Sequence, residues 1–141
     1  MKYVVLAGRI LNAFIFIMAA PGHFSQQDIS FAAAAHVPLA SIAVPFSGII
    51  ALLGGLSVAF GYKSKWGAWL LVIFLVPVTL MMHNFWAAPD KMAAQMQMAM
   101  FIKNISLLGA ALVISYFGTG PLSLDNRVSD YSGNAVIAKA E

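Results

Sequence analysis

The sequence predicts an all-α membrane protein, a bundle of four transmembrane helices. Hydrophobic residues occupy 61% of the 141 positions and charged residues only 9%, well below the roughly 25% charged residues of soluble domains. Four apolar segments are each close to the ~20 residues that cross ~30 Å of hydrocarbon. None of them shows the period-2 alternation of an outer-membrane barrel. The chain is therefore too apolar to fold as a water-soluble globule.

The apolar segments place the expected spans at residues 4–20, 39–60, 66–85 and 98–117. These spans form one transmembrane domain over residues 1–125, followed by a polar tail at residues 126–141. The first span resembles a signal peptide, but Arg9 and Asn12 interrupt its apolar core, so we expect it to be retained.

The first link, residues 21–38, is too long for a simple turn. Ser25 and Asp28 have the spacing of a capping box, in which a hydroxyl caps the helix and an acidic residue follows three positions later. An alanine-rich run continues to Ala35, and Val37–Pro38 would end the helix. We expect a short interfacial helix in this periplasmic link. Between the third and fourth spans, Pro89–Asp90 indicates that the last helix starts outside the membrane.

The basic residues indicate the orientation of the chain. They lie beside the first span, in the second link and in the tail: Lys2, Arg9, Lys63, Lys65, Arg127 and Lys139. The first link has none, and the third has only Lys91. By the positive-inside rule, both termini face the cytoplasm. Because these residues are scattered, no nucleic-acid partner is expected; the predicted partners are the lipid bilayer and either other membrane subunits or a second copy.

Lys103 interrupts the fourth span, with Asn104 beside it. A lysine at a helix centre costs about 2.5–3.5 kcal/mol on insertion scales. His83 and Asn84, at the outer end of the third span, lie in the same half of the bundle. These four residues form a candidate pocket for a quinone carbonyl or a small anion. Two alternatives stay open: Lys103 snorkels to the interface, or the four residues form an interhelical hydrogen-bond network.

Arg9 and Asp125 both belong to the inner side. A charge-assisted hydrogen bond between them would tie the first helix to the tail as a structural ion pair. Snorkelling of Arg9 and a functional role are the alternatives.

Metal and catalytic motifs are weak. The chain has no cysteine, so iron–sulfur and thiolate sites are excluded. Met92, Met96 and Met100 would suit copper(I), although methionine is also an ordinary packing residue. A zinc site would draw on His23, His36 and His83, yet no spacing such as H-E-x-x-H is present. We expect no metal and no covalent cofactor, and the catalytic residues, if any, are not identified.

Four stretches in order carry a family resemblance. They are Gly8–Leu11 with Pro21–His23, His36–Pro38 with Gly54–Gly61, His83–Trp86, and Lys103–Gly109 with Gly118–Asp125. With these motifs the chain resembles the DoxX family of small four-helix bacterial inner-membrane proteins. Many members carry a glutamate where this chain has Ala51, and a basic residue where it has His23.

The resemblance implies a multi-pass protein of the bacterial inner membrane, similar to the membrane subunit of thiosulfate:quinone oxidoreductase. The function expected from it is an integral subunit of a redox system, at most an oxidoreductase subunit that depends on a partner or on bound quinone. The competing hypothesis is a non-catalytic structural or assembly subunit of a larger membrane complex.

Overall fold

The structure is a computed structural model that describes residues 1–118 and 120–129. In the described part of the chain, the helical elements up to Phe117 are α1 (Lys2–Ala19), η1 (Ala20–Phe24), α2 (Gln26–Ala34), α3 (Ala40–Phe60), α4 (Ser64–Met82), η2 (Phe85–Ala87) and α5 (Lys91–Phe117). Within the described ranges, four helical segments are long and apolar enough to cross a membrane. The predicted fold class is confirmed, and the protein is a multi-pass membrane protein.

Side-chain caps set the start of two helices. Ser25 Oγ accepts a hydrogen bond from the Asp28 amide at 3.1 Å and so caps α2, the short helix predicted for the first link. Asp90 caps α5 through a bond of 2.8 Å from the Ala93 amide. The last helix therefore begins at Lys91, as Pro89–Asp90 predicted, and its polar first turns precede the apolar span that starts at residue 98.

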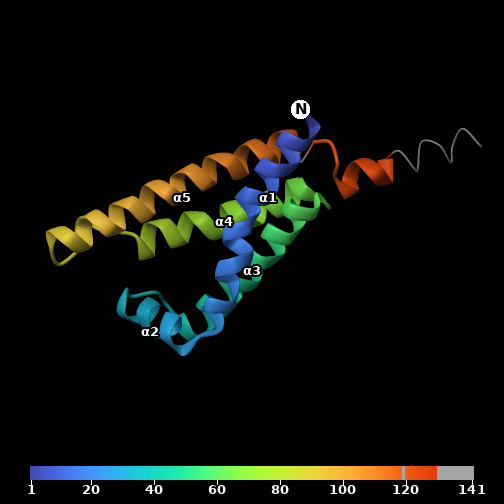
Figure 1. Cartoon of the computed structure of the whole chain (residues 1–141). Coiled ribbons are helices and arrows are strands. Elements are labelled where there is room, and N and C mark those ends of the chain that lie inside the picture. The colour runs from blue at the N-terminus through green and yellow to red at the C-terminus, as the bar shows by residue number, and fades with distance from the viewer. Residues whose placement is uncertain (119, 130–141) are drawn as a thin grey trace, which may run out of the picture.

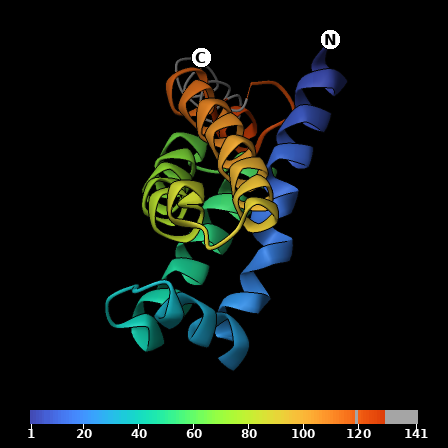
Figure 2. The same ribbon diagram turned by 90° about the vertical axis from the view of Figure 1, so that its left-hand side faces the viewer.

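The spanning helices form two antiparallel pairs (Figures 1 and 2). α1 packs against α3 and α5 packs against α4, while α3 and α4 join the pairs. Among the described residues, α1 and α5 make no extensive contact. The pairs converge at the end that holds the α3–α4 turn, Gly118 and residues 120–129, and they separate toward α2. We name these the inner end and the outer end, following the charge-based orientation.

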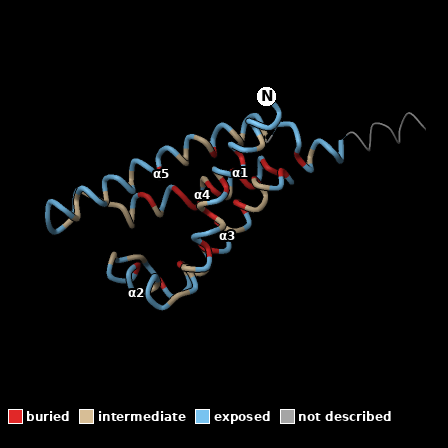
Figure 3. The backbone as a smooth tube through the Cα atoms, in the orientation of Figure 1, coloured by how far each residue is buried: buried red, intermediate tan, exposed pale blue. Residues whose placement is uncertain are grey.

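The buried core lies where the two pairs cross (Figure 3). It is built from small and branched side chains of all four spanning helices: Ala13, Phe16, Ala51, Val58, Ala68, Leu71, Phe74, Leu75 and Ala111. Gly54 and Gly67 bring α3 and α4 together, because a Cβ on Gly67 would overlap both Oγ and Cβ of Ser57. Such small residues allow the close packing on which helix association in lipid depends.

Arg9 and Asp125 hold the inner end together. The Arg9 side chain is only 5% exposed and donates from Nε to the Ala59 carbonyl at 3.2 Å and from Nη2 to the Leu122 carbonyl at 2.9 Å. The Asp125 carboxylate accepts from the Lys63 amide at 2.7 Å and from the Ser64 amide at 3.2 Å. Arg9 and Asp125 with these backbone partners are called the inner clasp below.

The clasp joins α1, α3, α4 and the segment after α5. Asp125 also donates its own amide to the Gly61 carbonyl at 2.9 Å and accepts from Ser64 Oγ at 3.1 Å. Arg9 is attracted electrostatically by Asp125, but these hydrogen bonds tie both residues to backbone groups of neighbouring elements. The direct Arg9–Asp125 ion pair stays a prediction. Of the predicted tail, residues 126–129 continue a short helical segment from Leu124, and residues 130–141 lie outside the described part.

The α3–α4 crossing yields a stability prediction. Replacing Gly67 with alanine places a methyl group against Ser57, so we expect a loss of about 1–3 kcal/mol from overpacking and a lower Tm in detergent. Gly109→Ala is the matched control, because a Cβ there meets no atom within 4 Å. Equal Tm values for the two variants would show that this crossing is not tightly packed.

The inner clasp yields a second prediction. Asp125→Ala removes the acceptor for the start of α4, so the segment around Arg127 should loosen and trypsin should cleave after Arg127 several-fold faster. Asp90→Ala is the control. It also removes a helix cap, but Asp90 caps the start of its own helix, α5, so the cleavage rate after Arg127 should not change. The measurement is a time course of limited proteolysis followed by mass spectrometry. Identical rates in wild type and Asp125→Ala would contradict the clasp.

Candidate functional site

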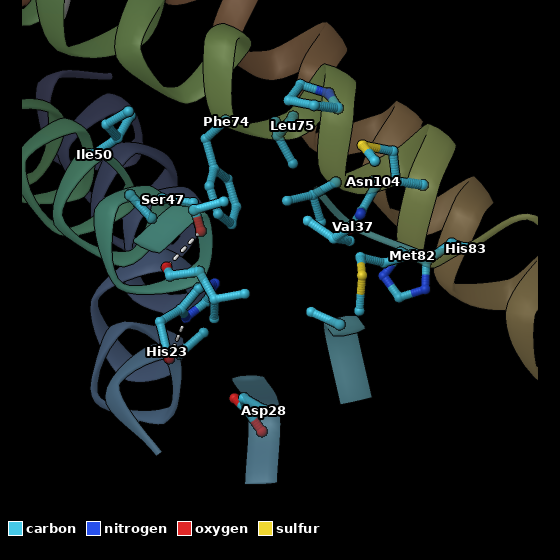
Figure 4. A pocket seen from close by; sticks show the side chains of 18 of the residues that line it. His23, Asp28, Val37, Ser47, Ile50, Phe74, Leu75, Met82, His83 and Asn104 are labelled. Carbon is cyan, nitrogen blue, oxygen red and sulfur yellow. Dashed lines mark hydrogen bonds between the residues drawn. The ribbon is translucent and has the colours of Figure 1, made fainter. Parts of the chain in front are cut away.

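A pocket of about 610 Å³ lies at the outer end, between the two helix pairs (Figure 4). Its lining comes from α1, η1, α2, α3, α4 and α5. Most of the lining side chains are apolar, and Ile50, Phe74, Leu75 and Val37 lie around the space in Figure 4. The site is therefore an apolar cavity with a few polar groups at its edges.

The chain connections explain why the pocket forms at this end. Ala32 of α2 is buried together with Ala40 and Val44, so α2 is packed onto the start of α3. α4 and α5 are instead linked by η2, which packs against α5. Because nothing comparable to the inner clasp joins the two pairs here within the described residues, they separate and leave the cavity between them.

One wall of the pocket carries His23 and Asp28. His23 Nδ1 lies 3.1 Å from the Ala19 carbonyl; a carbonyl only accepts, so Nδ1 carries the proton. In the neutral ring Nε2 is then an acceptor. The His23 ring lies 5.6 Å from that of Phe74. Gly48 makes room for it, because a Cβ at Gly48 would come within 2.5 Å of His23 Cβ.

The opposite wall comes from α4 and α5. His83 Nδ1 lies 2.9 Å from Gln97 Oε1 and donates to it, since an amide oxygen only accepts. Lys103 Nζ donates to Met100 Sδ at 3.5 Å. Asn104 is 5% exposed, and its side chain extends from α5 toward the pocket in Figure 4. This wall therefore offers donors at Lys103 Nζ and Asn104 Nδ2 beside acceptors at His83 Nε2 and Asn104 Oδ1, whereas the His23 wall offers acceptors.

Three of the four predicted pocket residues come together here. His83, Lys103 and Asn104 all line the pocket, while Asn84 does not. Asn84 lies at the start of η2, where its carbonyl accepts from the Ala87 amide. Their ligand-binding role stays a prediction.

Sequence reasoning did not place His23 or Asp28 at this pocket, nor Gln97 beside His83. Asp28 has the pattern of a helix cap, and His23 entered only as a zinc candidate. Gln97 precedes Asn104 by seven positions, and this spacing puts both side chains on one helix face. This spacing was the sequence signal that could have identified Gln97.

The candidate metal ligands are dispersed. His23 and His83 line the pocket, whereas His36 is exposed outside it. In the ranges 1–118 and 120–129, no three His, Cys, Asp or Glu side chains gather as a metal site would require. Met92 and Met96 are 76% and 62% exposed on the surface of α5, where they face the surroundings rather than the pocket.

Comparison with known proteins assigns the family. The sequence model of the SURF4 family matches residues 1–131. The chain belongs to the SURF4 family. It is 25% identical over 129 residues to the ER-derived vesicles protein ERV29 of Saccharomyces cerevisiae, covering 92% of this chain and 35% of that protein.

Two further relatives are similar to this chain, and one of them carries the Surfeit locus protein 4 name. The Surfeit locus protein 4 homolog of Drosophila melanogaster is 28% identical over 127 residues, 89% of this chain and 41% of that protein. The inner membrane protein YphA of Escherichia coli is 24% identical over 126 residues, 88% of this chain and 89% of that protein. The chain thus spans well under half of the two animal and fungal relatives. No solved structure is detectably similar to it.

The SURF4 match corrects the DoxX resemblance, which is wrong. Its motifs consist largely of glycine, leucine and other small or apolar residues, which recur in membrane helices because packing requires them. The function inferred from that resemblance, a subunit of a redox system, is wrong as well. Nothing in these relatives supports a bound quinone. The alternative of an assembly subunit gains no support from them either.

Proposed function

We propose that this SURF4-family chain is a membrane-embedded binding protein of the receptor type, whose ligand places an apolar body in the outer pocket. The pocket carries this proposal. Its volume of about 610 Å³ falls within the ~300–1,000 Å³ of small-ligand sites, which are typically apolar with a few placed polar groups. Because the bilayer is itself apolar, a mostly hydrocarbon ligand that enters from it would be held by van der Waals packing against these walls and by hydrogen bonds to the polar groups rather than by the hydrophobic effect.

The position of the pocket suits capture from the membrane. It lies between the helix pairs and is open rather than enclosed. In Figure 4 the side chains of α2 and η1 form one edge and those of α4 and α5 the other. A ligand could therefore enter without any spanning helix leaving the core.

The family supports binding rather than chemical conversion. The yeast relative is named for ER-derived vesicles, membranes in which a receptor would accompany its ligand. For the location of this chain we propose a bacterial-type inner membrane, supported by the Escherichia coli relative of similar length, which is named for that membrane. Further membrane subunits or a second copy stay predicted partners.

The test is photolabelling of the purified protein in nanodiscs. The probe is a long-chain alcohol that carries a diazirine in its hydrocarbon chain. We expect adducts on pocket-lining residues such as Phe31, Ile50 and Leu107, and several-fold less labelling there in Ser47→Trp, because an indole fills part of the cavity.

Leu53→Trp is the matched control. Leu53 lies on the same helix but is 54% exposed on its outer surface, so its replacement should leave pocket labelling unchanged. Labelling spread evenly over the outward-facing residues, and equal in both tryptophan variants, would contradict a binding pocket.

A further inference from the structure

Asn104 is a buried carboxamide with unused hydrogen-bonding capacity. It is only 5% exposed, yet its side chain has no hydrogen-bond partner among the described residues. Its polar atoms are not sealed off: in the described part of the chain, only Asn12 Nδ2 is a fully buried side-chain nitrogen or oxygen without a partner. Asn104 lines the pocket and is directed toward it in Figure 4.

Such a group requires a partner from the ligand. A carboxamide offers two N–H donors and one carbonyl acceptor, and a buried polar group without a hydrogen bond is costly. A hydrocarbon chain end placed against Asn104 would leave that cost in place. The part of the ligand that reaches α5 should therefore be polar.

Lys103 determines the charge of that polar part. It lines the same pocket and lies twelve positions after Lys91, hence ~18 Å along α5. Its ammonium donates to a thioether sulfur, which is a weak acceptor. The described acidic residues are Asp28, Asp90 and Asp125, and none of them forms an ion pair with Lys103. Lys103 is exposed, and its ammonium, which lines the pocket, attracts an anionic group of the ligand electrostatically.

The opposite wall excludes the reverse orientation. Asp28 lines the pocket there with an anionic side chain. Its carboxylate lies against Gly22, where a Cβ would come within 2.8 Å of Asp28 Oδ2. With the His23 acceptor nearby, an anionic group would be repelled from the α2 side and attracted to the α5 side.

We propose that the pocket selects a single-chain amphiphile that ends in a carboxylate. The carboxylate oxygens accept from Asn104 Nδ2 and Lys103 Nζ, and the hydrocarbon chain lies along Ile50 and Phe74. A carboxylate fits because it is compact and supplies two acceptors for two neighbouring donors. This proposal rests on the proposed function, since it names the ligand class of the same pocket.

The experiment is competition against the neutral diazirine probe in nanodiscs. The competitors are hexadecanoate in its ionised form and methyl hexadecanoate, which keeps the chain but not the charge. We expect hexadecanoate to displace the probe at about tenfold lower concentration, the change that one charge-assisted hydrogen bond provides. That preference should disappear in Lys103→Met and in Asn104→Leu.

Lys91→Met is the matched control. Lys91 is a second lysine of α5 that does not line the pocket, so its removal should preserve the preference. Probe labelling in each variant reports whether the pocket is intact. Equal displacement by acid and ester in a labelled wild-type pocket would overturn the carboxylate proposal, as would a preference that survives both Lys103→Met and Asn104→Leu. Absence of probe labelling from the wild type would instead overturn the proposed function.

Discussion

The buried guanidinium of Arg9 places a strong constraint on this fold. A cation in a spanning helix is costly unless it is hydrogen-bonded, and here the carbonyls of Ala59 and Leu122 satisfy it. That requirement draws the segment after α5 back onto α1 and α3, while Asp125 binds the start of α4. One end of the molecule is thus tied across all four spanning helices, and the other end is left to separate around the pocket.

Much of the fold could be predicted because it depends on local chemistry. The spans follow from apolar length, α2 from the cap at Ser25, and the location of Arg9 and Asp125 at the same end of the bundle from the topology. The pairing of α1 with α3 and of α5 with α4 could not be predicted, since large apolar side chains occur on buried and exposed faces of these helices alike. It is decided by close approaches, such as Gly54 against Gly67, that only the three-dimensional structure reveals.

The candidate site, like the fold, could be predicted only in part. Lys103 and Asn104 stand out in an apolar run, and their shared half of the bundle with His83 follows from topology. The pocket wall that carries His23 and Asp28 was missed. Both residues come from the link before α3, and no sequence signature shows that this link folds over the pocket. The family was also misjudged: short motifs of small residues report helix packing, which unrelated membrane proteins share, whereas the SURF4 match covers residues 1–131.

The central claim is that the two helix pairs are joined at the inner end and separated at the outer end. Dipolar EPR on spin-labelled cysteine pairs tests this claim most directly. The chain has no native cysteine, so Ser30→Cys with Gln95→Cys reports on α2 and α5 at the outer end, and Tyr3→Cys with Tyr62→Cys reports on the inner end. We expect a broad, long outer distance in nanodiscs that narrows when hexadecanoate is added, and an inner distance that stays narrow. An outer distance close to the ~8–10 Å of directly packed helices without ligand, or a broad inner one, would contradict this arrangement.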